Sequence, residues 1–357
     1  LIVFSALSFF TDTPELRLFG DGNTWQSIVG ASALLWIVHF LILRGVQTAA
    51  SINLVATLAK LLPLGLFVVL AMMMFKLDTF KLDFTGLALG VPVWEQVKNT
   101  MLITLWVFIG VEGAVVVSAR ARNKRDVGKA TLLAVLSALG VYLLVTLLSL
   151  GVVARPELAE IRNPSMAGLM VEMMGPWGEI IIAAGLIVSV CGAYLSWTIM
   201  AAEVPFLAAT HKAFPRIFAR QNAQAAPSAS LWLTNICVQI CLVLIWLTGS
   251  DYNTLLTIAS EMILVPYFLV GAFLLKIATR PLHKAVGVGA CIYGLWLLYA
   301  SGPMHLLLSV VLYAPGLLVF LYARKTHTHD NVLNRQEMVL IGMLLIASVP
   351  ATWMLVG

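Results

Sequence analysis

The sequence predicts an all-α protein that crosses a membrane several times. Hydrophobic residues make up 61% of the 357 residues and charged residues only 11%, whereas a soluble domain carries about 25% charged residues. The apolar residues also gather in runs of about 20, the length that an α-helix needs to cross a bilayer. A soluble core could not bury this much apolar sequence without exposing large hydrophobic patches.

The predicted membrane helices follow one another along the whole chain. Residues 1–10 form an apolar run without an initial methionine or a signal-peptide pattern, so we expect the chain to start partway through a membrane helix. Ten further runs are expected to span the bilayer: 26–43, 49–75, 100–119, 131–153, 177–204, 228–248, 252–278, 285–301, 304–322 and 337–356. We expect residues 1–357 to form a single transmembrane domain.

The connections alternate in charge, which predicts how the chain is oriented in the membrane. The longer ones, 76–99, 155–175 and 210–226, are amphipathic or rich in turn residues. Most of the 22 Lys and Arg residues belong to connections on one side: Arg44, Arg120, Arg122, Lys124, Arg125, Lys129, Lys212, Arg216, Arg220, Lys276, Arg280, Lys284, Arg324, Lys325 and Arg335. The positive-inside rule makes that side cytoplasmic, so the net charge of +5 does not indicate a nucleic-acid partner.

Five ionisable residues are predicted to lie inside the membrane: His39, Lys60, Glu112, Glu203 and Glu261. A charged side chain at the centre of a spanning helix costs about 3 kcal/mol. Residues that carry such a cost are candidate functional residues by default.

Glu112 is the strongest of these candidates, because Gly110 and Gly113 flank it within the apolar segment 105–114. Glycines let a helix open there and expose backbone N–H and C=O groups to a ligand, as in secondary transporters at the membrane midplane. The carboxyl group could also sense protons or open a gate. The alternative is a carboxyl group kept protonated by burial and hydrogen-bonded between helices.

The other charged candidates lie close to prolines, which free backbone carbonyls in a helix. Lys60 is either a fixed ammonium near such carbonyls or half of a structural ion pair. Glu261 either attracts a cationic substrate or makes a hydrogen bond between helices. Glu203, near a helix end, suits a gate better than substrate contact, and His39 is expected to be structural.

Two tryptophans accompany these residues. Trp106 lies one turn before the glycines, and Trp197 lies among small residues that allow close helix approach. Cation–π attraction between an indole face and a guanidinium or ammonium group stabilises the pair by about 2 kcal/mol when water is excluded. Ordinary packing within a helix bundle is the alternative for both.

Other chemistry is not indicated. The pair Cys237 and Cys241 lacks a complete set of metal ligands. A metal site is possible at the cluster 327–330, but a solvated loop explains it better. No His-Glu-x-x-His, Walker-type or Gly-x-Ser-x-Gly motif occurs in the sequence. We therefore expect no enzyme activity, no cofactor and no metal; a membrane-embedded enzyme and a non-transporting sensor remain minor alternatives.

The segment 105–112, followed by the basic loop 120–129, resembles the sixth helix of the amino acid–polyamine–organocation (APC) transporter superfamily. More narrowly, it is similar to the bacterial basic amino acid/polyamine antiporters. Three further stretches, 162–168, 201–205 and 262–267, resemble the arginine/ornithine exchangers among them.

The resemblance implies roles for the residues near the glycines. The carbonyl group of Ile109, beside Gly110 at the helix break, would bind the α-amino group of the substrate. Trp106 would cover the aliphatic stem of the substrate as an outer gate, and Trp197 would stack on its distal cationic group.

The remaining charged residues receive gating and binding roles. Glu112 would belong to the inner gate and to any pH response, and Glu203 would act near that gate. Lys60 matches a lysine that many members of the superfamily place where sodium-coupled relatives bind their ion. Glu261 stands near a position where small hydroxylated residues are common in relatives, a departure that would favour a compact ammonium group.

The resemblance further implies an inverted-repeat bundle of the five-plus-five LeuT/APC type, without its first two helices and with extra C-terminal helices. Residues 1–10 would then be the end of the third helix, and the later spans would be helices four to thirteen. The implied function is electroneutral exchange of arginine for ornithine by alternating access, in a multi-pass protein of the bacterial inner membrane.

Alternatives are a lysine, histidine or diamine/agmatine exchanger and a proton-coupled basic amino acid permease. The expected partners are these basic amino acids, membrane lipid and, because relatives include dimers, a second copy of the chain.

Overall fold

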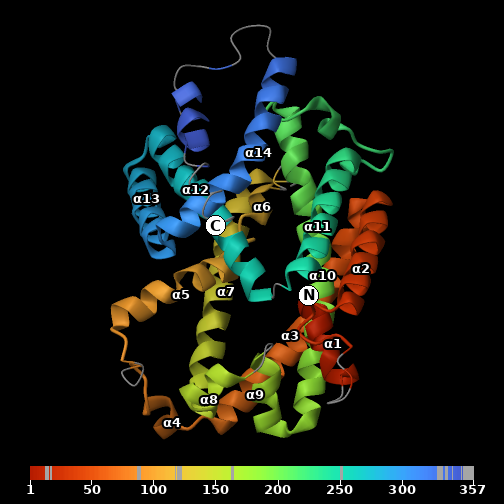
Figure 1. Ribbon diagram of the computed structural model, residues 1–357. Coiled ribbons are helices and arrows are strands. Elements are labelled where there is room, and N and C mark those ends of the chain that lie inside the picture. Colours follow the sequence, from red (N-terminus) through yellow and green to blue (C-terminus); the bar gives the residue numbers. More distant parts are fainter. Residues whose placement is uncertain are drawn as a thin grey trace. The chain divides into compact units, whose positions relative to one another are not determined.

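The computed structural model of the protein is all-helical over the residues that it describes (Figure 1). These residues are 1–12, 16, 18–86, 90–116, 118, 123–161, 165–249, 252–327, 333, 337–339, 341–346 and 348. No strand occurs among them, so the predicted helical fold class is confirmed.

The chain divides into two compact units. The first comprises residues 1–90, 110–207 and 217–252, and the second comprises residues 91–109, 208–216 and 253–357. Helices of the first unit are α1 (Ile2–Thr11), α2 (Trp25–Leu43), α3 (Val46–Met74), α4 (Leu77–Lys81), α6 (Gly113–Val116), α7 (Lys124–Val152), α8 (Arg155–Glu160), α9 (Ser165–Met174), nearly all of α10 (Pro176–Thr210), and α11 (Ser228–Thr248). The second unit contains α5 (Val93–Phe108), nearly all of α12 (Tyr252–Ile277), α13 (Pro281–Ser301) and α14 (Pro303–His327).

Six helical segments among the described residues are long and apolar enough to cross a bilayer. They are Trp25–Leu43, Asp126–Val152, Pro176–Thr210, Ser228–Thr248, Leu255–Ile277 and Pro281–Ser301. Each coincides with a run that the sequence predicts to span the membrane. The last predicted run, 337–356, is described only in part, as helix over residues 337–339 and 341–346 and at residue 348.

Helix α5 begins earlier than the sequence predicts. Residues 93–99, expected in a connection, form its first turns, because α5 starts at Val93. In the same unit the Trp94 ring packs on that of Trp296 of α13, with 4.3 Å between the ring centroids. This aromatic contact stabilises turns whose polar residues hide them from a search for apolar runs.

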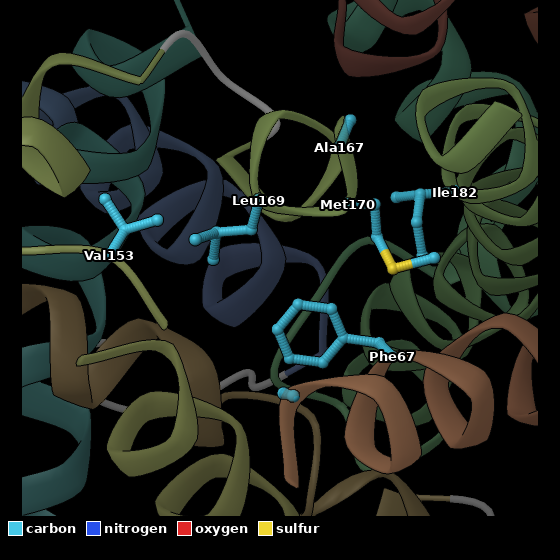
Figure 2. Packing of buried hydrophobic residues seen from close by; sticks show 7 residues of the cluster. Phe67, Val153, Ala167, Leu169, Met170 and Ile182 are labelled. Carbon is cyan, nitrogen blue, oxygen red and sulfur yellow. The ribbon is translucent and has the colours of Figure 1, made fainter. Parts of the chain in front are cut away.

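One apolar cluster of the first unit joins α3, α9 and α10. Its buried members are Phe67, Ala71, Val153, Ala167, Leu169, Met170 and Ile182. Figure 2 shows the Phe67 ring, the Met170 thioether and the Ile182 side chain converging on one space. The short helix α9, which lies in a predicted outer connection, is thus anchored to α3 and α10.

Pro205 interrupts the hydrogen bonds of α10, because a proline has no N–H to donate to the carbonyl four residues earlier. That carbonyl belongs to Ala201, and the Thr234 hydroxyl of α11 lies 3.3 Å from it. The same hydroxyl lies 2.9 Å from the Ser230 carbonyl of its own helix. One hydroxyl proton is therefore shared between two acceptors.

Pro266 has the same effect in the second unit, where it frees the carbonyl of Met262 in α12. The Tyr313 hydroxyl of α14 donates to that carbonyl at 2.6 Å. A bilayer offers no water to replace such a donor, so this bond ties α14 to α12 beside Pro266.

Tyr313→Phe removes this donor and nothing else. We expect a loss of about 1 kcal/mol of stability, because the Met262 carbonyl is left without a partner. Thermal unfolding of the purified full-length protein in detergent measures the loss. Tyr322→Phe is the matched control, because Tyr322 is on the same helix and 61% exposed; equal unfolding temperatures for the two variants would contradict the assignment.

Candidate functional site

The membrane helix that contains the two glycines is broken, as the sequence predicts. Helix α5 ends at Phe108, and Ile109 is extended, with φ −61° and ψ 130°. Gly110 follows with φ +108°, a conformation that side chains rarely tolerate. Helix α6 begins at Gly113, so a short non-helical segment separates the two helices.

Glu112 holds this segment in place. Its Oε2 atom accepts a hydrogen bond from the N–H of Gly110 at 2.8 Å. Its own carbonyl accepts from the N–H groups of Val115 and Val116, at 2.8 and 3.1 Å, and so starts α6. The Gly110 carbonyl accepts from the N–H of Gly113 at 3.0 Å. The carboxyl group that the sequence singles out therefore stabilises the turn in which it lies.

Helix α10 packs directly on the broken segment. A Cβ atom on Gly110 would lie 2.7 Å from Cζ2 of Trp197, so the indole rests against the glycine Cα. A Cβ atom on Gly113 would lie 2.6 Å from Sδ of Met200, one helical turn further along α10. A larger residue at position 110 would meet the rigid indole, whereas a Cβ atom at position 113 would meet only the end of the flexible Met200 side chain. Trp197 is still 43% exposed, so part of its ring remains open to a ligand.

The structure thus brings together three of the predicted site residues, Gly110, Glu112 and Trp197, within the first unit. Lys60 and Glu203 belong to the same unit, on α3 and α10. Glu203 is only 3% exposed. Lys60 is partly buried and forms no ion pair among the described residues.

Trp106 and Glu261 belong to the second unit. Trp106 is partly buried near the end of α5, where its carbonyl accepts the N–H of Ile109 at 3.1 Å. The neighbouring Leu105 packs with Leu264 of α12 in a buried cluster. Glu261, three residues before Leu264 and 6% exposed, lies on the same side of α12.

Sequence reasoning missed Met200 and gave Asn235 no role. Met200 lies three residues after Trp197, a spacing that places both on one helix face, but only the structure reveals the contact with Gly113. Asn235 is buried and hydrogen-bonded to His39.

Among the described residues no group of three or more His, Cys, Asp or Glu side chains could hold a metal ion. Residues 328–330 of the predicted His cluster lie outside the described residues, and so do residues 162–164.

Comparisons with known proteins point to one family. A family model described as amino acid permease matches residues 1–345. An arginine/ornithine antiporter of Pseudomonas aeruginosa is 43% identical over 344 residues, which cover 91% of this chain and 70% of that protein. An arginine/agmatine antiporter of Chlamydia pneumoniae is 38% identical, covering 98% of this chain and 76% of that protein. A second arginine/agmatine antiporter, from Chlamydia caviae, is 41% identical over 88% of this chain and 68% of its own length.

Gly110→Ala should destabilise the protein by about 1–3 kcal/mol, because it combines a strained φ with a clash against the indole. Gly140→Ala is the control, since a Cβ there meets open space within α7. A double-mutant cycle with Trp197→Leu, followed by thermal unfolding, separates the two causes. The penalty of Gly110→Ala should fall when Trp197 is removed; strictly additive effects would contradict the contact.

Proposed function

Because this chain belongs to the amino acid permease family, we propose that it exchanges extracellular arginine for intracellular ornithine across the bacterial inner membrane. It is a multi-pass membrane protein and a transporter rather than an enzyme. The name of the Pseudomonas relative supports this substrate pair. The names of the Chlamydia relatives support a second candidate, exchange of arginine for agmatine.

The observation that carries the proposal is the broken helix covered by an indole. Ile109 is extended, so its carbonyl leaves the direction of α5 and can accept the α-ammonium group of an amino acid. The exposed part of the Trp197 ring can stack on a guanidinium or ammonium group. An α-amino acid with a cationic side chain carries both groups. In this proposal Trp106 covers the aliphatic stem of the substrate and closes the site from outside.

The acids and the lysine are assigned to gating and charge balance. Glu112 links the inner gate to the broken segment, because its carboxylate holds the Gly110 N–H. Protonation of that carboxyl would weaken the bond and loosen the turn. Glu203 acts near the same gate, and Glu261 attracts the cationic end of the substrate. Lys60 supplies a fixed positive charge, so no sodium ion is needed.

The mechanism is alternating access around a fixed site, without covalent chemistry. Arginine and ornithine each carry one net positive charge, so their one-for-one exchange moves no net charge. Agmatine lacks the carboxylate and carries two positive charges, so its exchange for arginine moves one. Exchange is obligatory if the empty carrier reorients slowly, because only loaded states then cross the barrier. Lipid surrounds the helices, and a second copy of the chain is a proposed partner.

The first experiment uses the full-length protein in liposomes. We expect labelled arginine to enter only liposomes loaded with unlabelled ornithine, at a rate that does not change with the membrane potential. Dependence on the potential with internal agmatine but not with ornithine would show that both exchanges occur. Uptake into empty liposomes driven by the potential or by a proton gradient would overturn obligatory exchange. If arginine is not transported but lysine, histidine or diamines are, arginine is the wrong substrate and the transported compound takes its place in the proposal.

Trp197→Leu should weaken arginine binding by about 2 kcal/mol, or about 30-fold, through loss of the cation–π contact. Trp197→Phe keeps an aromatic face and should lose less. Binding is measured by isothermal titration of the purified protein. Trp246→Leu is the control, because Trp246 is a half-exposed residue of α11. Wild-type affinity in Trp197→Leu would remove Trp197 from the substrate site.

A further inference from the structure

Helices α2 and α11 of the first unit lie side by side (Figure 1) and share a row of polar contacts, although both are apolar enough to span a membrane. The indole N–H of Trp36 donates to Oε1 of Gln239 at 3.2 Å. The amide of Gln239 in turn donates to the Ser32 hydroxyl at 2.9 Å. The transport site described above does not use these residues.

His39 and Asn235 form the most deeply buried part of this row. Their exposed fractions are 0% and 1%. Nδ2 of Asn235 lies 2.8 Å from Nδ1 of His39. The remaining polar atoms of the pair, Nε2 of His39 and Oδ1 of Asn235, have no hydrogen-bond partner among the described residues. Buried polar atoms are rarely left unpaired, so this pair requires a reason other than packing.

Three aromatic rings surround the imidazole. Its centroid lies 4.4 Å from that of Trp232, 5.2 Å from that of Trp36 and 5.3 Å from that of Phe40, all in edge-on arrangements. These rings enclose the imidazole, and no carboxylate occurs among its described contacts.

The Asn235 amide suits both protonation states of the imidazole. With neutral His39, Nδ1 accepts a hydrogen from the amide NH2 and the imidazole proton is on Nε2. When a second proton binds at Nδ1, that nitrogen becomes a donor and needs an acceptor. Rotation of the Asn235 amide by 180° exchanges its two polar atoms and brings the unpaired Oδ1 to the position next to Nδ1 of His39. The pair can therefore take up one proton and keep a hydrogen bond across the two helices.

We propose that His39 and Asn235 form a proton-binding site between α2 and α11. His39 lies four residues, or about 6 Å along the axis, from the end of α2 at Leu43. The next residue, Arg44, belongs to the side that the charge pattern assigns to the cytoplasm, so the proton comes from that side. The ligand is a proton, exchanged with cytoplasmic water.

Few other ionisable groups face this site from the helices packed around it. Helix α1 has none, and Lys60 is the one ionisable side chain of α3. Helix α10 contributes Tyr194, which packs against the cluster of Val38 and Ile42, and the buried Glu203 beyond it. The two cysteines of α11, Cys237 and Cys241, are exposed. His39 itself contacts Asn235 and the three rings.

Nitrogen-15 NMR of histidine-labelled full-length protein in lipid bilayers tests the site without reference to any transported substrate. His39→Gln identifies the His39 signals by their loss, and His283→Gln, at an exposed position, is the control. We expect a neutral imidazole with its proton on Nε2 near pH 8 that becomes an imidazolium ion on acidification to about pH 5. A ring that stays neutral over this whole range would overturn the proposal.

Asn235→Leu tests the contribution of the amide, because leucine has a similar volume and no polar atom. We expect the His39 ring of this variant to remain neutral over the same range, whereas wild-type His39 titrates. Titration unchanged from the wild type would overturn the pairing of His39 with Asn235. In liposomes, lowering the internal pH should change the exchange rate of the wild type more than that of His39→Gln. An identical response of the two proteins would contradict any effect of His39 protonation on exchange.

Discussion

Lipid offers no hydrogen-bond partner to a backbone amide or carbonyl, so each departure from regular helix inside the bilayer must be matched by another group. At three such departures among the described residues, a side chain takes the place of water. Glu112 binds the amide exposed at the helix break. Thr234 and Tyr313 approach the carbonyls that two prolines set free. The broken helix is thus held in shape by side chains of the protein itself.

This constraint explains what could be predicted from the sequence. Apolar runs located the membrane helices, because the bilayer fixes their length and composition together. The glycines around Glu112 located the break, because glycine is the residue that tolerates a positive φ. Helix α5 was placed too late, since its first turns are polar and depend on the contact between Trp94 and Trp296. Such a contact joins residues far apart in the chain, and no local pattern encodes it.

The same limit applies to the candidate site. Trp197 and Gly110 were each singled out, one for its aromatic face and the other for its flexibility. Nothing in the sequence shows that the indole rests on the glycine, or that Met200 fills the neighbouring position. The partners of Pro205 and Pro266 are equally hidden, because a freed carbonyl predicts a donor but not the helix that supplies it.

Helix α10 connects the two polar regions of the first unit. Its Trp197 and Met200 side chains lie on the broken segment. On another face, Leu195 and Ala202 pack in a buried cluster with residues of α2 and α11. A change in the packing of α2 and α11 would therefore reach the broken segment through direct contacts along one helix, which is a physical route for coupling.

The close fit between α10 and the broken segment also has an evolutionary consequence. A side chain at position 110 needs the volume that the indole at position 197 now fills. Neither residue of this pair can be exchanged freely while the other stays as it is. The two positions should therefore covary among homologues, with bulk lost at position 197 wherever it is gained at position 110.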